Sequence, residues 1–276
     1  KVFGLQSRVY MVRVSYFQKP YRRVAAQLGG GELIPSPSLQ TEAGRHWMKG
    51  LEHLPEGSDE LIEKMPGSLA IAIGEAVEDA VTHAKDTRYA MGSVGNHVLM
   101  SQTVIGQETM KQFEMADDYP DIMIGCIGGG SSFGGFHWPY IGEKILRGKK
   151  IRFIAVEPEA CPSVSKGMYR YDFPTSEPTP LFLMYTLGHR FIPPAIHAGG
   201  LRYHGMAPEI CHEVAQGITE IRAVSQMETF EAAKIFAEEE GWISAPEPAH
   251  AIKVAFDEAL KCKETGESKC IAFLFC

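Results

Sequence analysis

The sequence lacks the features that mark membrane, secreted and nucleic-acid-binding proteins. No apolar run approaches the roughly 20 residues of a membrane-spanning helix. Acidic residues outnumber basic ones, 34 against 27, and a net charge of −7 leaves no basic excess to displace the counterions of a phosphate backbone. No basic-then-apolar leader opens the chain. We therefore expect neither a membrane protein, nor a nucleic-acid-coating protein, nor a secreted one.

Cysteine is sparse and scattered. The chain has no CxxC pair and no Cys/His cluster at the spacing of a zinc site. An even number of cysteines does not by itself indicate a disulfide framework in a chain of 276 residues. We expect free thiols in a reducing compartment, the cytoplasm, with a plastid as the alternative.

The composition is that of a globular protein. Apolar residues make up 45% and charged residues 22% of the chain, which argues against disorder, a collagen-like fibre and a coiled coil. The length allows one large or two modest α/β domains. Strand and helix patterns alternate, and 121–127, a helix to about 147 and 151–156 form a β-α-β unit. We expect an α/β fold with a doubly wound, mostly parallel sheet.

The local patterns also give approximate positions for the individual elements. They predict strands at 8–14, 32–35, 219–224 and 270–276. They predict one helix that begins at 18 and ends at Gly29–Gly31, one that begins at a cap on Ser68, and further helices at 95–115, 228–240 and 246–262. Loops are predicted at 51–66 and 161–208. The last strand reads as buried and stops without an exit turn. A chain end seldom coincides with a core strand, so we expect an excised piece of a longer protein, the alternative being a compact C-terminal strand.

The strongest local signal is a glycine-rich loop between a strand and a helix. Gly128, Gly129 and Gly130 precede Ser131 and Ser132. Glycines allow close approach of a ligand to the backbone, and the following helix adds partial positive charge. Such a cup suits a phosphate monoester. No Walker lysine follows, and the spacing does not fit GxGxxG; the alternative is a tight strand-to-helix turn.

Two further segments are candidates for a site. The loop at 196–208 places two histidines, an arginine and a tyrosine among glycines, and either lines a small-molecule site or is simply aromatic. Glu247 stands between two prolines at a predicted helix start, where an acid is also favoured by the helix dipole alone. Cys126 lies inside a predicted strand and is more typical of core than of a nucleophile.

These residues resemble the β chain of tryptophan synthase in its second, tryptophan-synthase-like subtype, and the resemblance runs nearly end to end. Besides the glycine loop, it is carried by Tyr10–Tyr16, Gln18–Arg22, Pro35–Ser38, Pro66–Ile73, Gly95–Leu99, Gln102–Gly106, Val156–Pro162, Met184–His189, His197–Pro208 and Ala245–Ala251.

The resemblance implies a fold-type-II pyridoxal phosphate (PLP) enzyme that joins L-serine to indole. It assigns the PLP phosphate to Gly128, Gly129, Gly130, Ser131 and Ser132, the last replacing the family's usual Asn. It further implies that Glu247 lies near the cofactor ring, that Cys276 stands where a Ser normally touches the pyridine nitrogen, and that Gly200 and Arg202 bind substrate, Arg202 marking the subtype by replacing an Asp. The thiol of Cys276 would be a weak hydrogen-bond partner for the pyridine nitrogen.

The resemblance also implies an absence, because the family's Schiff-base lysine and catalytic glutamate precede Lys1, and a Gly-rich stretch is expected after the last residue. It implies an N-terminal, mobile domain remnant at 1–115 and a PLP-phosphate-binding domain at 116–276. A homodimer with weak or no α-subunit pairing is expected. The alternatives are another PLP β-replacement or β-elimination enzyme, of serine deaminase or cysteine synthase type, and a non-catalytic remnant.

Overall fold

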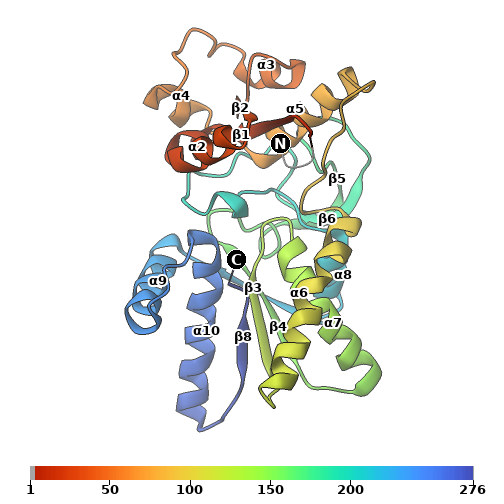
Figure 1. Cartoon of the computed structure of the whole chain (residues 1–276), viewed down its shortest axis with the longest axis vertical. Helices are drawn as coiled ribbons and strands as arrows, with labels where there is room; N and C mark the ends of the chain where they lie inside the picture. The colour runs from red at the N-terminus through yellow and green to blue at the C-terminus, as the bar shows by residue number, and fades with distance from the viewer. Residues whose placement is uncertain (1–3, 276) are drawn as a thin grey trace.

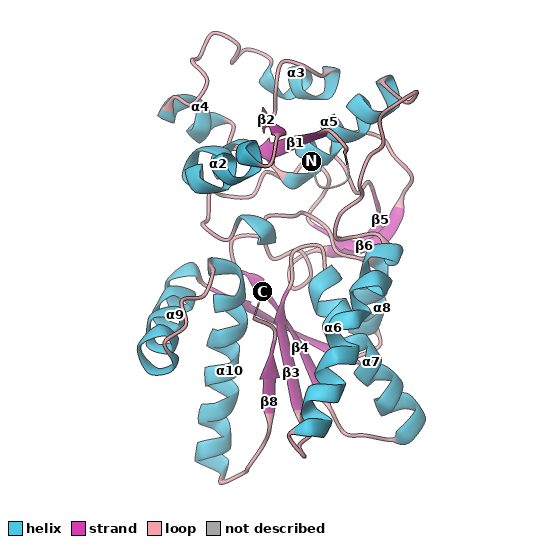
Figure 2. Cartoon of the chain, viewed as in Figure 1, coloured by secondary structure: helices cyan, strands magenta, loops and turns pink. Residues whose placement is uncertain are grey.

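A computed structural model describes residues 4–275 of the chain (Figure 1). Two units are stacked along the long axis, and a two-stranded antiparallel ribbon with long loops lies between them. The upper unit contains β1 and β2 with α1 to α5, and the lower unit contains a four-stranded sheet flanked by helices (Figure 2).

The upper unit is built on a parallel strand pair with five short helices. Its elements are β1 (Ser7–Val12), α1 (Arg13–Gln18), α2 (Pro20–Leu28), β2 (Gly31–Ser36), α3 (Glu42–Met48), α4 (Asp59–Lys64) and α5 (Leu69–Thr82). The strand predicted at 8–14 therefore ends two residues early, where α1 begins. The segment predicted as loop at 51–66 contains α4, whose first turn is capped by the Ser58 hydroxyl accepting from Leu61 N. The predicted cap at Ser68 is confirmed, because its hydroxyl accepts from Ile71 N at 3.2 Å.

The lower sheet is entirely parallel, in the order β7-β4-β3-β8, which confirms the expected fold class. Its strands are β3 (Ile122–Cys126), β4 (Arg152–Pro158), β7 (Thr219–Val224) and β8 (Ile271–Phe273). β3 is buried throughout, as predicted. The C-terminal strand is not the buried strand that was predicted: β8 has three half-buried residues and lies at a sheet edge, where only one neighbour covers it.

Helices cover both faces of this sheet. They are α6 (Asn96–Met115), α7 (Ser131–Arg147) and α8 (Pro208–Ala215) on one side and α9 (Gln226–Glu240) and α10 (Pro246–Thr265) on the other (Figure 1). α6 and α7 approach closely, since a Cβ on Gly106 would stand 2.4 Å from the Phe136 carbonyl oxygen. The predicted division at 115/116 thus follows a helix that packs with the lower unit, and this packing favours a division before α6.

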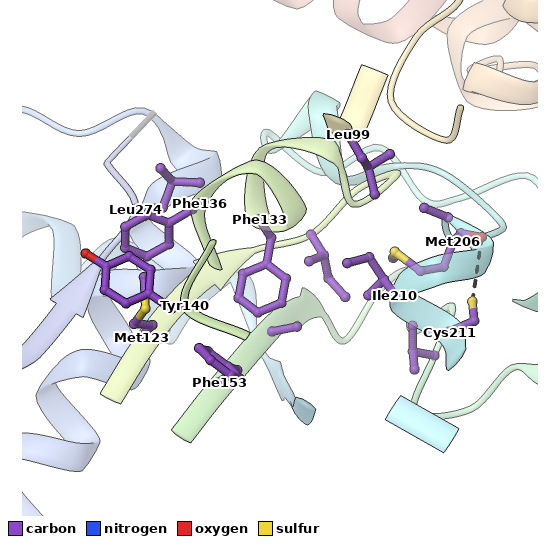
Figure 3. Packing of buried hydrophobic residues seen from close by; sticks show 14 of the residues in the cluster. Leu99, Met123, Phe133, Phe136, Tyr140, Phe153, Met206, Ile210, Cys211 and Leu274 are labelled. Carbon is purple, nitrogen blue, oxygen red and sulfur yellow. Dashed lines mark hydrogen bonds between the residues drawn. The ribbon is translucent and has the colours of Figure 1, made fainter. Parts of the chain in front are cut away.

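The main core lies under α7 and continues to α8. Phe133, Tyr140 and Phe153 are fully buried there, with Met206 and Ile210 at the α8 end of the same cluster (Figure 3). Burial of large apolar side chains is the dominant favourable contribution to folding. This core fixes the start of α7, and with it the glycine loop.

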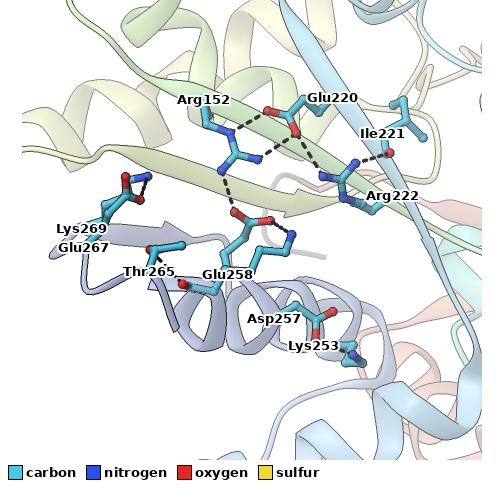
Figure 4. Close-up of polar contacts among 11 residues, drawn as sticks. Arg152, Glu220, Ile221, Arg222, Lys253, Asp257, Glu258, Thr265, Glu267 and Lys269 are labelled. Carbon is cyan, nitrogen blue, oxygen red and sulfur yellow. Dashed lines mark hydrogen bonds and ion pairs between the residues drawn. The ribbon is translucent and has the colours of Figure 1, made fainter. Parts of the chain in front are cut away.

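The opposite face is joined to the sheet by an ion network centred on one arginine. Arg152 on β4 donates from Nε to Glu220 on β7 at 2.8 Å and from Nη1 to Glu258 on α10 at 2.6 Å (Figure 4). Planar, bidentate arginine contacts of this kind also fix orientation. The network therefore sets how α10, which carries Glu247 in its first turn, lies on the sheet.

The long segment predicted as loop at 161–208 is partly regular. It forms an antiparallel pair, β5 (Met168–Asp172) with β6 (Phe182–Thr186), and a short 3-10 turn, η1 (Gly199–Leu201). Its loops contact both units: Ser176 N donates to the Ala70 carbonyl on α5 at 3.1 Å, and Ala207 N donates to the Gly129 carbonyl at 3.0 Å.

Candidate functional site

The glycine loop forms the turn from β3 into α7. Gly130 has a left-handed backbone (φ 104°) and occupies the N-cap of α7 without any side-chain cap, a conformation that costs other residues energy. The first N–H groups of a helix have no intrahelical acceptor, and they lie at the positive end of its dipole. Ser131 is 4% exposed and Ser132 is half-buried. The loop has the chemistry of an anion site.

The loop is tightly enclosed by backbone from both units. A Cβ on Gly128 would stand 2.1 Å from the Gly200 carbonyl oxygen, and one on Gly129 would stand 2.6 Å from Ser93 Cβ. The glycines are therefore required by neighbouring chain as well as by any ligand. Ser93 is a site residue that the sequence did not single out, although its Gly-Ser-Val-Gly context before a helix is a signal of the same type.

Glu247 is held in the first turn of α10, directly behind the η1 turn. Its Oε1 accepts from Gly200 N at 3.0 Å and lies 3.5 Å from Lys19 Nζ, while Oε2 is buried without a hydrogen-bond partner. Burial raises the pKa of this carboxyl, but the Gly200 N–H and the Lys19 charge outweigh burial and lower the pKa below its ordinary value. Glu247 is therefore held as a carboxylate with one oxygen engaged and the other buried without a protein partner.

Arg202 is fully buried and directed at backbone. Its guanidinium donates to the carbonyls of Pro193 at 2.7 Å, Pro194 at 2.8 Å and Gly67 at 3.2 Å, and Nη1 has no partner. Burial lowers its pKa to about 10. The contact with Gly67 joins the lower unit to the residues before α5, so the side chain holds two segments together across the site.

The other polar residues of the 196–208 loop do not converge. Tyr203 lines the cavity described below and donates to the Pro174 carbonyl at 2.7 Å. His204 is buried, with Nε2 2.9 Å from the Phe173 carbonyl, and burial lowers its pKa to about 4. His197 is exposed and packs its ring on α9. Of these three side chains, only Tyr203 lines the cavity, and His204 and His197 make contacts elsewhere in the fold.

A cavity of about 410 Å³ opens beside the glycine loop, within the roughly 300–1,000 Å³ of small-molecule sites. Gly129 and Gly200 lie in its wall. The remaining wall is mostly apolar and comes from both units: Leu69, Ile73, Val77, Tyr89, Met91, Gly92, Ser93, Val94, Pro174, Thr175, Thr179, Pro180, Phe182 and Tyr203. The arrangement offers an apolar, flat-ring-sized space adjoining an anion cup.

Two other kinds of site find no support in residues 4–275. No cluster of three or more His, Cys, Asp or Glu side chains within this range is placed to hold a metal ion. None of the helices in it combines the length and the apolar character needed to cross a membrane. Cys276, for which the sequence suggested a contact with the cofactor ring, lies outside the described residues.

A doubly wound parallel sheet whose glycine-rich strand-to-helix turn borders an apolar cavity defines an α/β protein with a candidate small-molecule site at that turn. The sequence profile of the family described as "Pyridoxal-phosphate dependent enzyme" matches residues 1–276, and the chain belongs to that family.

Relatives and solved structures agree with this assignment. The chain is 56% identical to "Tryptophan synthase beta chain 2" of Aquifex aeolicus, over 98% of this chain and 61% of the relative, and 53% identical to the protein so named in Methanothermobacter thermautotrophicus, over 99% and 61%. It thus spans about 61% of the length of these relatives. The fold is similar to crystal structures of a threonine deaminase from T.th. (TM-score 0.62, 16% identity, 99% of this chain and 70% of that one) and O-acetyl serine sulfhydrylase isoform 3 from Entamoeba histolytica (0.62, 17%, 99% and 62%).

The residues present fit the cofactor of this family. The glycine loop leads into the N-terminus of α7, which favours a dianionic phosphate. The buried, unpartnered Oε2 of Glu247 supplies a second polar group on the far side of Gly200. Oε2 is a buried polar atom without a protein partner, and folded proteins rarely leave such an atom unless water or a ligand uses it.

Proposed function

We propose that the whole protein carries out PLP-dependent β-replacement, joining L-serine to indole to give L-tryptophan. The observation that carries the proposal is the cavity: an apolar space of about 410 Å³ shares Gly129 with the anion cup and Gly200 with the turn that Glu247 holds. An aromatic, uncharged nucleophile such as indole suits that wall, whereas water or sulfide needs no such space. The names of the relatives support the same reaction.

In this proposal each residue of the chain has a defined part. Gly128, Gly129, Gly130, Ser131 and Ser132 hold the cofactor phosphate through main-chain N–H groups and hydroxyls. Bound PLP withdraws electrons from the substrate's α-carbon. As the resemblance implies, we assign Glu247 a place near the cofactor ring and Cys276 the position where a Ser normally touches the pyridine nitrogen.

Substrate is held by the turn around Gly200. Gly200 lies in the cavity wall, so we assign it to direct contact. Arg202 follows this turn and is fixed by its contacts with three carbonyls outside the turn, and we assign its unpartnered Nη1 to the substrate. Removal of water by the apolar wall strengthens each of these polar contacts.

We further propose that this chain binds cofactor but does not turn over substrate alone. The resemblance places the Schiff-base lysine and a catalytic glutamate in a segment before Lys1, and covalent catalysis through a lysine has no substitute among the groups described above. We place the mobile N-terminal unit before α6 and the phosphate-binding unit from α6 onward, which moves the expected division from 115/116 to about residue 95. The whole protein is proposed to be a cytoplasmic homodimer with weak or absent α-subunit pairing.

A chimera tests the proposal. The parts of the Aquifex aeolicus relative that precede and follow the aligned region are joined to Lys1 and to Cys276, and the purified chimera is supplied with PLP, L-serine and indole. We expect L-tryptophan to form, as measured by chromatography, with no product from the 276-residue chain alone. Pyruvate release without tryptophan would point to a deaminase, and no cofactor binding by either protein would contradict the proposal outright.

A further inference from the structure

One ion pair joins the two units. Among residues 4–275, the only salt bridge between the upper unit (4–95) and the rest is Lys19 Nζ to Glu247 Oε1, at 3.5 Å. The two side chains are 17% and 13% exposed. Surface pairs contribute little to stability, but a pair largely removed from water is screened less by solvent and salt.

Lys19 is placed by the junction of two helices. It is both the C-cap of α1 and the N-cap of α2, and its N–H donates to the Ser15 carbonyl at 3.1 Å. A Cβ on Gly199 would stand 3.2 Å from Lys19 Nζ and 2.7 Å from Ser15 Oγ. The ammonium group therefore rests against the η1 turn, next to the residue that Glu247 binds.

We propose that Lys19 is a positioning residue that orients Glu247 toward the cofactor and makes the docking of the upper unit part of the cofactor site. The inference rests on the proposed function, because it takes Glu247 as the acid that faces the ring. The Lys19 ammonium and the Gly200 N–H both engage Oε1, so the free Oε2 has one defined direction.

The coupling follows from the cost of burying charge. If the upper unit moves away, Glu247 loses the Lys19 ammonium together with the nearby Arg22 charge, and an unpaired, partly buried carboxylate is unfavourable. Docking supplies that partner, and a cofactor that needs Glu247 oriented binds the docked arrangement more tightly. By linkage, bound cofactor then favours docking to the same degree.

The experiment uses the 276-residue chain and three variants. Lys19→Met removes the charge, Lys19→Arg keeps it, and Lys19→Glu combined with Glu247→Lys exchanges the partners. Hydrogen exchange at the Gly200 N–H and at 13–20 reports docking, and equilibrium dialysis with PLP reports affinity. Lys64→Met, at an exposed i,i+4 pair of α4, is the matched control.

We expect Lys19→Met to speed exchange at both segments about three- to tenfold and to weaken PLP binding by a similar factor, while Lys19→Arg and Lys64→Met stay within about twofold of wild type. The exchanged pair should restore slow hydrogen exchange but not PLP affinity, because the acid no longer faces the ring. Unchanged exchange in Lys19→Met would overturn the coupling. If Lys19→Met speeds exchange but the wild-type chain does not bind PLP, the docking role of Lys19 stands and the proposed function is refuted.

Discussion

Gly128→Ala places the smallest possible side chain at the point where the two halves of the site meet. The added Cβ would stand 2.1 Å from the Gly200 carbonyl oxygen and 3.1 Å from its carbonyl carbon. Both are backbone atoms, so the clash cannot be relieved by turning a side chain. The η1 turn must move, and its movement breaks the alignment between Gly200 N–H and Glu247.

The magnitude follows from the contact. Overpacking a close-packed region costs about 1–3 kcal/mol, equivalent to roughly 2–4 °C in melting temperature per kcal/mol for a domain of this size. PLP affinity should fall at least about tenfold, the equivalent of ~1.4 kcal/mol, since cup and turn are both displaced. Calorimetry measures the first effect and equilibrium dialysis the second.

Gly142→Ala is the control, because it lies in α7, the helix that follows the glycine loop, and a Cβ there meets nothing within 4 Å. Replacing a helical glycine with alanine should stabilise the chain by roughly 0.5–1 kcal/mol and leave PLP affinity unchanged. A Gly128→Ala variant with wild-type melting temperature and wild-type affinity would refute this reasoning.

Three further outcomes are expected. Val77→Phe, on the cavity wall, should weaken indole binding at least about tenfold in fluorescence titration without changing PLP affinity. Val81→Phe, on the exposed side of α5, should change neither affinity. Equal effects of the two variants on indole binding would contradict the cavity assignment. Because the pKa of Glu247 is lowered in the folded chain, its carboxylate stabilises the fold at pH values above its ordinary pKa of 4.5, and this stabilisation is lost as the pH falls through the folded pKa. Glu247→Gln should therefore flatten the acid side of the plot of melting temperature against pH. His204, with its pKa lowered to about 4 by burial, stays neutral while the unfolded side chain protonates below its ordinary 6.5, so stability should drop between pH 6.5 and 4; a His204→Gln variant that shows the same drop would exclude this cause.

The parts of the fold set by local sequence were predictable. β3, the glycine loop and α7 follow from an apolar run, glycines and a helical stripe, and the Ser68 cap follows from its residue type. The C-terminal strand was predicted as buried because its residues are apolar, yet burial depends on how many neighbours the sheet provides, and β8 has one. The helix at 59–64 was not predicted, because it follows a polar loop and its six residues are too few to show a helical period.

The site was predictable in its pieces and not in its assembly. The glycine cup and Glu247 are visible as local motifs, but the contact of Lys19 with Glu247 joins residues 228 positions apart, and no local pattern encodes it. The helix predicted after Ser68, α5, carries Ile73 and Val77, and its local sequence does not indicate that these two side chains line the cavity. The resemblance implies that Arg202 binds substrate, and only the fold shows that its guanidinium also donates hydrogen bonds to backbone carbonyls.

The most direct test is a crystal structure of the chain grown with PLP. We expect the phosphate at the start of α7, within hydrogen-bond distance of the N–H groups of residues 128–132, and the ring between Gly200 and the cavity. A phosphate bound anywhere else, with the 128–132 amides unused, would contradict the proposed site.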